Sequence, residues 1–401
     1  MRQQVVLLAL TTAICLISDS MLYIVLPVFW QEVGLENLWQ VGVVLAINRL
    51  IRIPLSPIIA LLYNRISRKS GITIALIASF IITVGYGVAN SFLFWVILRS
   101  LWGVVWTLLR MGTFLSITEI SSTDNRGYFF GLYNGLYRMG SLFGMLVGGI
   151  LADILGLRNV ALLFSLVILI ALPFILRASK LQNQPMNPIL SEKFSLKNLV
   201  ALLRDFPTVM ILLTSCVITF IYEGVFSSIL SILIKINYPS GISIYTLLIG
   251  VATLSGILQS IRFALGPFIS PKVGNIIDRS VKVRSYTLII TLVAALLLFI
   301  TISFKINIFI WVIFVILIFF TSTILTIIID TIASEVSIKS KVILTTLYTI
   351  TVDIGAALGP LIAYFLGDIF IVFWLLKGLL IFLILIWLLT IFNRNKKILY
   401  R

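Results

Sequence analysis

The 401-residue sequence contains no histidine and only two cysteines. Without histidine the chain has no imidazole metal ligand and no histidine proton relay, so carboxylates are the groups expected to carry protons near neutral pH. Cys15 and Cys216 both lie within long apolar runs, which argues against a disulfide framework. The sequence also lacks a nucleophile–base pattern, a metal-ligand cluster and a GxxxxGKS/T phosphate loop. We therefore expect neither a metal nor a cofactor, and neither an enzyme nor an ATP-driven pump.

Charged residues are scarce as well. They make up 11% of the chain, whereas a soluble domain carries about 25%, and 60% of the residues are hydrophobic. A run of about 20 apolar residues is long enough to cross about 30 Å of hydrocarbon. We therefore predict an all-α polytopic membrane protein with twelve transmembrane helices. The first helix is expected to be retained rather than cleaved as a signal peptide, because it contains Asp19 and lacks a cleavage site. The twelve runs lie near 5–30, 39–62, 71–89, 92–117, 128–151, 158–178, 207–234, 244–270, 285–303, 306–330, 342–366 and 369–392.

Basic residues outnumber acidic ones by 30 to 14, for a net charge of +16, but they form no exposed stripe that would suit a nucleic acid. With a cytoplasmic N-terminus, 20 of them fall in cytoplasmic segments, and three, Arg158, Lys235 and Lys305, fall in outer loops. This positive-inside bias places both termini in the cytoplasm. We expect a multi-pass monomer of a bacterial inner membrane, whose partners are the lipid bilayer, a small-molecule substrate and protons.

A polar segment divides the apolar runs into six and six. Residues 179–205 contain two prolines and are typical of a cytoplasmic linker, so we predict one six-helix bundle over 1–178 and another over 206–401. The halves resemble each other. SPIIALLYNR at 56–65 recurs as SPKVGNIIDR at 270–279, and LYNGLYRMGSLFGM at 132–145 recurs as LYTITVDIGAALGP at 347–360, with nearly the same offset. Two pseudo-symmetric bundles related by an axis along the membrane normal are the layout of one class of transporter.

Short motifs resemble those of the major facilitator superfamily. Residues 60–69 (A-x-x-x-N-R-x-S-R-K) are similar to the family's G-x-x-x-D-R-x-G-R-R/K loop, and residues 274–282 are similar to its degenerate second copy. Residues 99–103 resemble the R-x-x-Q-G element of the drug:proton antiporter branch, and the glycines within 131–149 resemble its glycine-rich signature. The resemblance implies the twelve-helix facilitator fold and transport by alternating access. It also implies a gating role for five loop residues: Arg65, Arg68, Lys69, Asp278 and Arg279.

The sequence departs from these motifs at several positions. Ala60, Asn64 and Ser67 stand where the family loop has Gly, Asp and Gly, and Met145 stands where the antiporter signature has proline. Each motif also has a structural interpretation. The basic loop residues could anchor to anionic headgroups, and glycines spaced by four could let two helices pack closely.

Seven basic residues lie within the predicted spans, where a charge usually faces a cavity, pairs with an acid or marks a substrate path. Five of the six arginines among them lie in the first bundle, where Asp19 is the one clear acid. An arginine surplus suits an anionic or zwitterionic solute, because the guanidinium fork matches carboxylate and phosphate. Structural ion pairs and snorkelling of Arg49 and Arg99 to the outer interface are the alternatives. The predicted substrate site comprises Tyr23, Arg49, Arg52, Trp106, Arg110, Asn134, Arg138 and Arg262.

Four acids within the spans are the candidates for the coupling proton: Asp19, Glu223, Asp330 and Asp353. Burial among apolar residues favours the neutral form of a carboxyl group, which allows it to bind a proton. Asp353 and Arg138 occupy equivalent places in the repeat, so the pseudo-twofold axis predicts that they face each other.

The leading hypothesis is a secondary transporter that exports a small anionic or zwitterionic organic solute by proton coupling. Two alternatives use the same residues. One is uptake of an organic anion by proton symport, and the other is a lipid flippase, because arginine pairs also suit phosphate headgroups.

Overall fold

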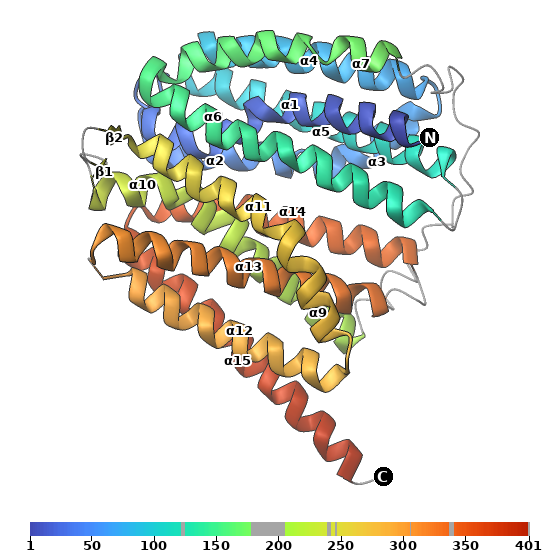
Figure 1. Ribbon diagram of the computed structural model, residues 1–401, viewed down its shortest axis with the longest axis vertical. Helices are drawn as coiled ribbons and strands as arrows, with labels where there is room; N and C mark the ends of the chain where they lie inside the picture. The colour runs from blue at the N-terminus through green and yellow to red at the C-terminus, as the bar shows by residue number, and fades with distance from the viewer. Residues whose placement is uncertain are drawn as a thin grey trace. The chain divides into compact units, whose positions relative to one another are not determined.

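The computed structural model describes residues 1–121, 125–177, 205–238, 242–244, 247–304, 306–336 and 341–399. Within these ranges the chain is helical except for turns and one short antiparallel hairpin, β1 (Ile242–Ile244) and β2 (Leu247–Ile249) (Figure 1). The all-α expectation is therefore confirmed, and the hairpin is the one addition to it among the described residues. Residues 179–204 of the predicted linker lie outside the described part of the chain.

The helices follow one another along the chain with short connections. The first seven are α1 (Arg2–Phe29), α2 (Leu38–Leu50), α3 (Arg52–Tyr63), α4 (Arg68–Val88), α5 (Phe92–Ile120), α6 (Arg126–Leu169) and α7 (Leu172–Arg177). The others are α9 (Phe206–Thr219), the π-helix η1 (Phe220–Phe226), α10 (Ser227–Asn237), α11 (Val251–Ile277), α12 (Val281–Ile302), α13 (Ile308–Val336), α14 (Lys341–Leu366) and α15 (Ile369–Leu399).

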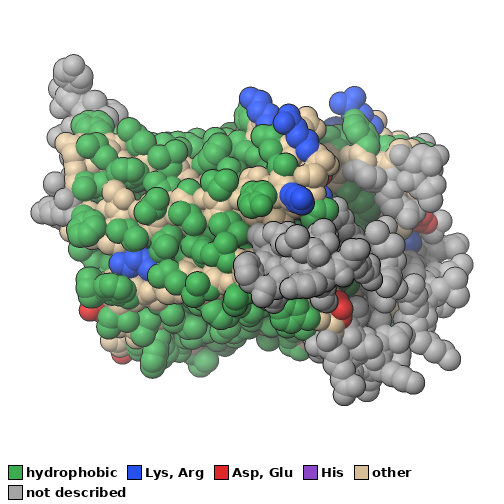
Figure 2. Space-filling model, turned by 90° about the horizontal axis from the view of Figure 1, so that it is seen from below, with side chains coloured by type: hydrophobic (Ala, Val, Ile, Leu, Met, Phe, Trp, Pro, Cys, Tyr) green, Lys and Arg blue, Asp and Glu red, His purple; other side chains and the backbone are tan. Residues whose placement is uncertain are grey.

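Ten helical segments of the described chain are long and apolar enough to cross a membrane. One of them, Tyr128–Arg177, runs through Gly156, whose φ of 76° is non-helical and divides the segment into two spans. Only glycine adopts this left-handed conformation without steric cost. With α11 added, the helices account for the twelve predicted spans. Hydrophobic side chains cover most of the described surface seen in Figure 2, as expected for helices that face lipid.

The chain forms two compact units, which we describe separately. Unit 1 comprises Met1–Ser191, Ser227–Phe263 and Pro360–Phe365, and unit 2 comprises Glu192–Phe226, Ala264–Gly359 and Leu366–Arg401. The division into bundles at 1–178 and 206–401 stays a prediction from the internal repeat.

Glycines of the repeated motif pack α6 against α1 in unit 1. A Cβ atom on Gly140 or Gly144 would overlap the carbonyl oxygens of Ala13 and Ile17, so only glycine permits this backbone approach. The close-packing interpretation of the glycine-rich signature therefore accounts for these two residues.

The second half repeats this packing within unit 2. Gly355 and Gly359 are the counterparts of Gly140 and Gly144 in the repeated motif. They place α14 against α9 and η1, where a Cβ would overlap the carbonyl oxygen of Cys216 and the backbone of Gly224. The repeat found in the sequence is thus also a repeat of helix packing.

Asp153 on α6 caps the first turn of α11 within unit 1. Its two carboxylate oxygens accept hydrogen bonds from the backbone N–H groups of Ala252 (3.2 Å) and Thr253 (2.7 Å). We expect Asp153→Ala to lower the free energy of unfolding by about 1 kcal/mol, since helix caps contribute about 0.5–2 kcal/mol and the helix dipole favours an anion there. Thermal melts of purified protein measure this. Asp153→Asn keeps one acceptor, so its melting temperature should lie between those of wild type and Asp153→Ala. Equal melting temperatures for Asp153→Ala and wild type would show that the cap contributes nothing.

Candidate functional site

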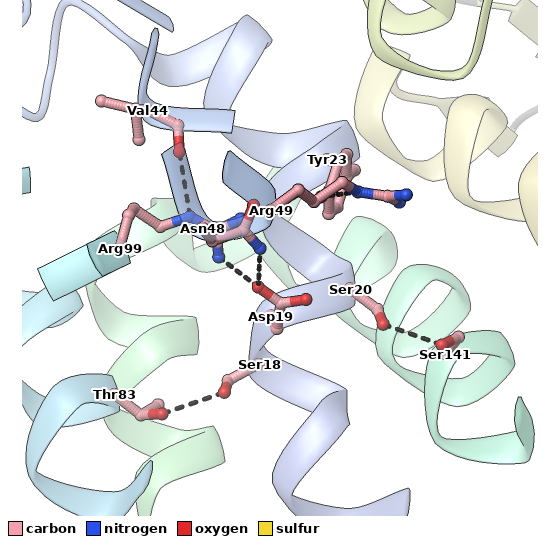
Figure 3. A network of polar contacts seen from close by, with 10 residues as sticks. All are labelled: Ser18, Asp19, Ser20, Tyr23, Val44, Asn48, Arg49, Thr83, Arg99 and Ser141. Atoms are coloured by element: carbon pink, nitrogen blue, oxygen red, sulfur yellow. Dashed lines mark hydrogen bonds and ion pairs between the residues drawn. The ribbon is translucent and has the colours of Figure 1, made fainter. Parts of the chain in front are cut away.

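A buried ion pair joins α1 to α5 in unit 1. The Arg99 guanidinium donates through Nη1 to Asp19 Oδ1 and through Nε to the Val44 carbonyl oxygen at 3.1 Å (Figure 3). Arg99 is 0% exposed and Asp19 is 5% exposed. The snorkelling alternative is therefore wrong for Arg99, because its charge is neutralised inside the protein rather than at the interface.

Local sequence features explain this placement. Helix α5 begins after Ser91, whose hydroxyl caps the N–H of Phe94 at 3.4 Å, and Arg99 lies two turns further on. One turn beyond Arg99, a Cβ atom on Gly103 would overlap the side chain of Ile51 and the carbonyl oxygen of Asn48. The spacing of Arg99 and Gly103 thus presents a guanidinium and a bare backbone on one helix face, which lets α2 approach α5 beside the ion pair.

Asn48 contacts the same carboxylate. Its Nδ2 donates to Asp19 Oδ1 at 3.5 Å, and its side chain is 0% exposed. Two buried hydroxyl pairs flank the site and tie α1 to its neighbours: Ser18 with Thr83 at 2.9 Å and Ser20 with Ser141 at 3.0 Å (Figure 3).

Two of the predicted substrate arginines contact aromatic rings next to this network. Arg49 donates through Nε to the Tyr23 hydroxyl at 3.2 Å, and Tyr23 also lies 5.8 Å from the Arg99 guanidinium, measured to the ring centroid. The Arg52 guanidinium lies 5.3 Å from the Trp106 ring centroid. Cation–π contact holds a guanidinium over the face of an aromatic ring.

The start of α3 explains the position of Arg52. Pro54 has no N–H to donate to the carbonyl of Leu50, where α2 ends, and Arg52 is the first residue of α3. Arg49 and Arg52 therefore flank a break in the second span, and both side chains are half-buried.

The remaining predicted substrate residues lie outside the network in Figure 3. Arg110 on α5 and both Asn134 and Arg138 on α6 are exposed, and Arg262 on α11 is half-buried. Their participation in substrate binding stays a prediction.

The other candidate acids belong to unit 2. Glu223 lies in η1, Asp330 in α13 and Asp353 in α14, and the Tyr348 hydroxyl donates to Asp330 Oδ1 at 2.5 Å. Asp330 is exposed, whereas Glu223 and Asp353 are half-buried. Asp19 is therefore the most deeply buried of the four candidates.

The residues of the predicted gating loops differ in how deeply they are buried. Arg68 is 5% exposed and pairs with Glu119 at the end of α5, while Ser67 caps α4 by accepting from Ser70 N at 3.0 Å. This pairing accounts for Arg68 without an anionic headgroup. Lys69 donates to the Leu176 carbonyl at 3.4 Å, and in the second copy Asp278 lies 3.9 Å from Arg284. Arg65 and Arg279 are exposed.

The two residues that hold Asp19 are not among the predicted site residues. Arg99 was placed in a motif and Asn48 was not singled out. The available signal was that both are polar residues within apolar spans, which are rare and usually functional.

Long apolar helices in two similar halves, with an acid–arginine pair buried among them, define a polytopic membrane transporter. The chain belongs to the Major Facilitator Superfamily, whose family model matches residues 8–343.

Named relatives and one solved structure agree with this family. The chain is 26% identical over 284 residues to the multidrug resistance protein MdtG of Escherichia fergusonii, covering 70% of this chain and 66% of the relative. MdtG of Citrobacter koseri is 25% identical over 284 residues, 70% of this chain and 67% of the relative. A bacterial homologue of the human lysosomal transporter Spinster, solved in an inward-facing unoccupied conformation, shares the fold with a TM-score of 0.69 at 16% identity, over 90% of this chain and 81% of that one.

Proposed function

We propose that this transporter exports small zwitterionic or anionic organic solutes in exchange for protons, with Asp19 carrying the proton. The observation that carries the proposal is the buried Asp19–Arg99 pair, which lies beside Tyr23 and the half-buried Arg49. Similarity to multidrug resistance proteins supports the export direction. Under this proposal both termini are cytoplasmic, as the distribution of basic residues predicts.

The ion pair supplies a chemical basis for coupling. Arginine does not release its proton, so Asp19 is the partner that changes charge. Protonation of Asp19 leaves Arg99 without its counter-charge in a buried site, which is costly unless another group moves or an anion arrives. The protonation state of Asp19 therefore determines which arrangement of the site is favourable.

The charge of the solute decides between the two modes of coupling. The ammonium group of a zwitterion competes with the proton for Asp19 while Arg49 and Arg52 hold its anionic group, and this competition gives exchange. A simple anion instead binds best when Asp19 is protonated and Arg99 is available, and this joint binding gives symport. The Asp19–Arg99 pair thus also favours the second candidate, proton–anion symport.

Flux measurements test the proposal. Purified protein in proteoliposomes should drive a zwitterionic solute against its gradient when an opposing proton gradient is imposed, and collapse of that gradient should stop accumulation. Comparison with simple anions and with cationic dyes separates exchange from symport. Transport that is indifferent to the pH gradient for every solute would contradict the proposal, and movement of fluorescent phospholipid would favour a flippase.

Arg52 tests the charge class of the solute. We expect Arg52→Lys to weaken binding about tenfold to a hundredfold, because one charge-assisted hydrogen bond contributes about 1.5–3 kcal/mol and lysine lacks the planar fork that lies near Trp106. Arg52→Ala should weaken it further. Equilibrium binding and melting temperature are measured on the same preparations.

Arg158→Lys is the matched control, since Arg158 on α6 contacts the Glu32 carbonyl at 3.0 Å, away from the site. Unchanged affinity together with a lower melting temperature in the Arg52 variants would make Arg52 a scaffold residue.

A further inference from the structure

Asp19 has contacts from two donors in the structure, and they differ in what they can do after it binds a proton. Arg99 has five N–H donors and no acceptor. It can therefore pair with the carboxylate but cannot accept a hydrogen bond from the carboxylic acid. The amide of Asn48 has both a donor group and an acceptor.

The Asn48 amide oxygen is buried beside Asp19. The side chain is 0% exposed, and its Oδ1 has no hydrogen-bond partner among the residues that the structure describes. A buried acceptor without a partner is costly, and native structures rarely keep one without a reason. The same amide donates through Nδ2 to Asp19 Oδ1 at a long distance of 3.5 Å.

We propose that Asn48 is a positioning residue that stabilises the protonated form of Asp19 by accepting its O–H hydrogen bond through Oδ1. The inference rests on the proposed role of Asp19 as the proton carrier. While Asp19 is charged, the Asn48 amide donates weakly to the carboxylate through Nδ2, and Oδ1 accepts no hydrogen bond from the described residues. When Asp19 is protonated, a half-turn of the amide about its terminal bond exchanges Oδ1 for Nδ2, so that the amide oxygen faces the carboxylic acid and accepts its O–H hydrogen bond. The contact of Gly103 with the Asn48 backbone holds the amide beside the carboxyl while it turns.

Of the two described residues that hydrogen-bond to Asp19, Arg99 and Asn48, only Asn48 carries an acceptor. The charged and titratable groups that face Asp19 are Arg99 from α5, Tyr86 from α4 and Tyr23 from its own helix, with Arg49 from α2 reaching Tyr23. The two arginines are donors only. The Tyr23 hydroxyl already accepts from Arg49 Nε. The nearby hydroxyls of Ser18 and Ser20 are paired with Thr83 and Ser141 (Figure 3).

Infrared titration of the purified protein in nanodiscs tests the proposal without transport. The C=O stretch of protonated Asp19 is identified as the band that Asp19→Asn removes. In wild type this band should lie at the lower frequency of an acid whose O–H is hydrogen-bonded. In Asn48→Leu it should move to higher frequency, and the pH at half-protonation should fall by about one unit, a tenfold change in proton affinity.

Thr83→Val is the matched control, because it breaks the buried Ser18–Thr83 hydrogen bond beside Asp19 without touching the carboxylate. It should lower the melting temperature and leave the band and the half-protonation pH in place. If the role of Asn48 is purely structural, Asn48→Leu should likewise lower the melting temperature and leave the band and the half-protonation pH in place. That result would overturn the proposal. A rise in the half-protonation pH in Asn48→Leu would overturn it as well.

Two further outcomes are decisive. If Asn48→Leu does not fold, the wild-type band alone decides, since a non-hydrogen-bonded frequency would overturn the proposal. If Asp19→Asn keeps pH-driven transport while Asn48→Leu still shifts the titration, the contact is real and the proposed coupling role of Asp19 fails.

Discussion

Asp19→Asn is expected to abolish pH-driven transport in proteoliposomes, reducing accumulation to the level seen without a proton gradient, while exchange down a solute gradient continues. Asparagine keeps the shape of the side chain and an oxygen for Arg99, but it cannot gain or lose a proton. The chain has no histidine that could take over, and Asp19 is the most buried of the candidate acids. Uptake and exchange are measured on the same vesicles, so that a general loss of folding is distinguished from a loss of coupling.

Asp153→Asn is the control for this change, because it makes the same chemical substitution at an exposed carboxylate that caps α11. Coupling should persist in that variant. If Asp19→Asn also retains full coupling, the proton carrier is one of the acids of unit 2: Glu223, Asp330 or Asp353.

Arg99→Gln is expected to destabilise the protein by about 3–5 kcal/mol at alkaline pH, because it leaves the Asp19 carboxylate buried without a counter-charge. The loss should be smaller at acidic pH, since a protonated Asp19 needs no counter-charge. Arginine cannot be neutralised in this way, so the free energy of unfolding of the Asp19→Asn variant itself should change little with pH at this site. Chemical or thermal unfolding in detergent at several pH values measures the difference.

The double variant Asp19→Asn/Arg99→Gln tests whether the two residues act as a pair. Each single variant leaves one buried charge without its partner, whereas the double variant leaves none. The double variant should therefore be more stable than the sum of the two single effects predicts. Additive losses would show that Asp19 and Arg99 stabilise the protein independently. Recovery of stability without recovery of pH-driven transport would separate the structural role of the pair from its role in coupling.

The amino-acid sequence by itself determined the class of fold. In a membrane every backbone polar group must be satisfied within the chain, so apolar runs of sufficient length have to be helices, and their number and charge asymmetry can be counted directly. The internal repeat of the sequence is also a repeat of helix packing, since Gly140 and Gly355 pack equivalent helices in the two halves. The apolar runs are a local signal, because each run depends on residues that are close in the chain.

Only the tertiary structure decided which buried charges meet. Asp19 and Arg99 are 80 residues apart, and the sequence placed Arg99 near enough to a span end to reach the interface. Its burial depends on how α5 packs against α1 and α2, which Gly103 permits by its lack of a side chain. The role of Asn48 could not be assigned from the sequence for the same reason. A single amide in an apolar span has no periodic pattern, and it gains significance only when folding brings its side chain to a carboxylate 29 residues away in the chain.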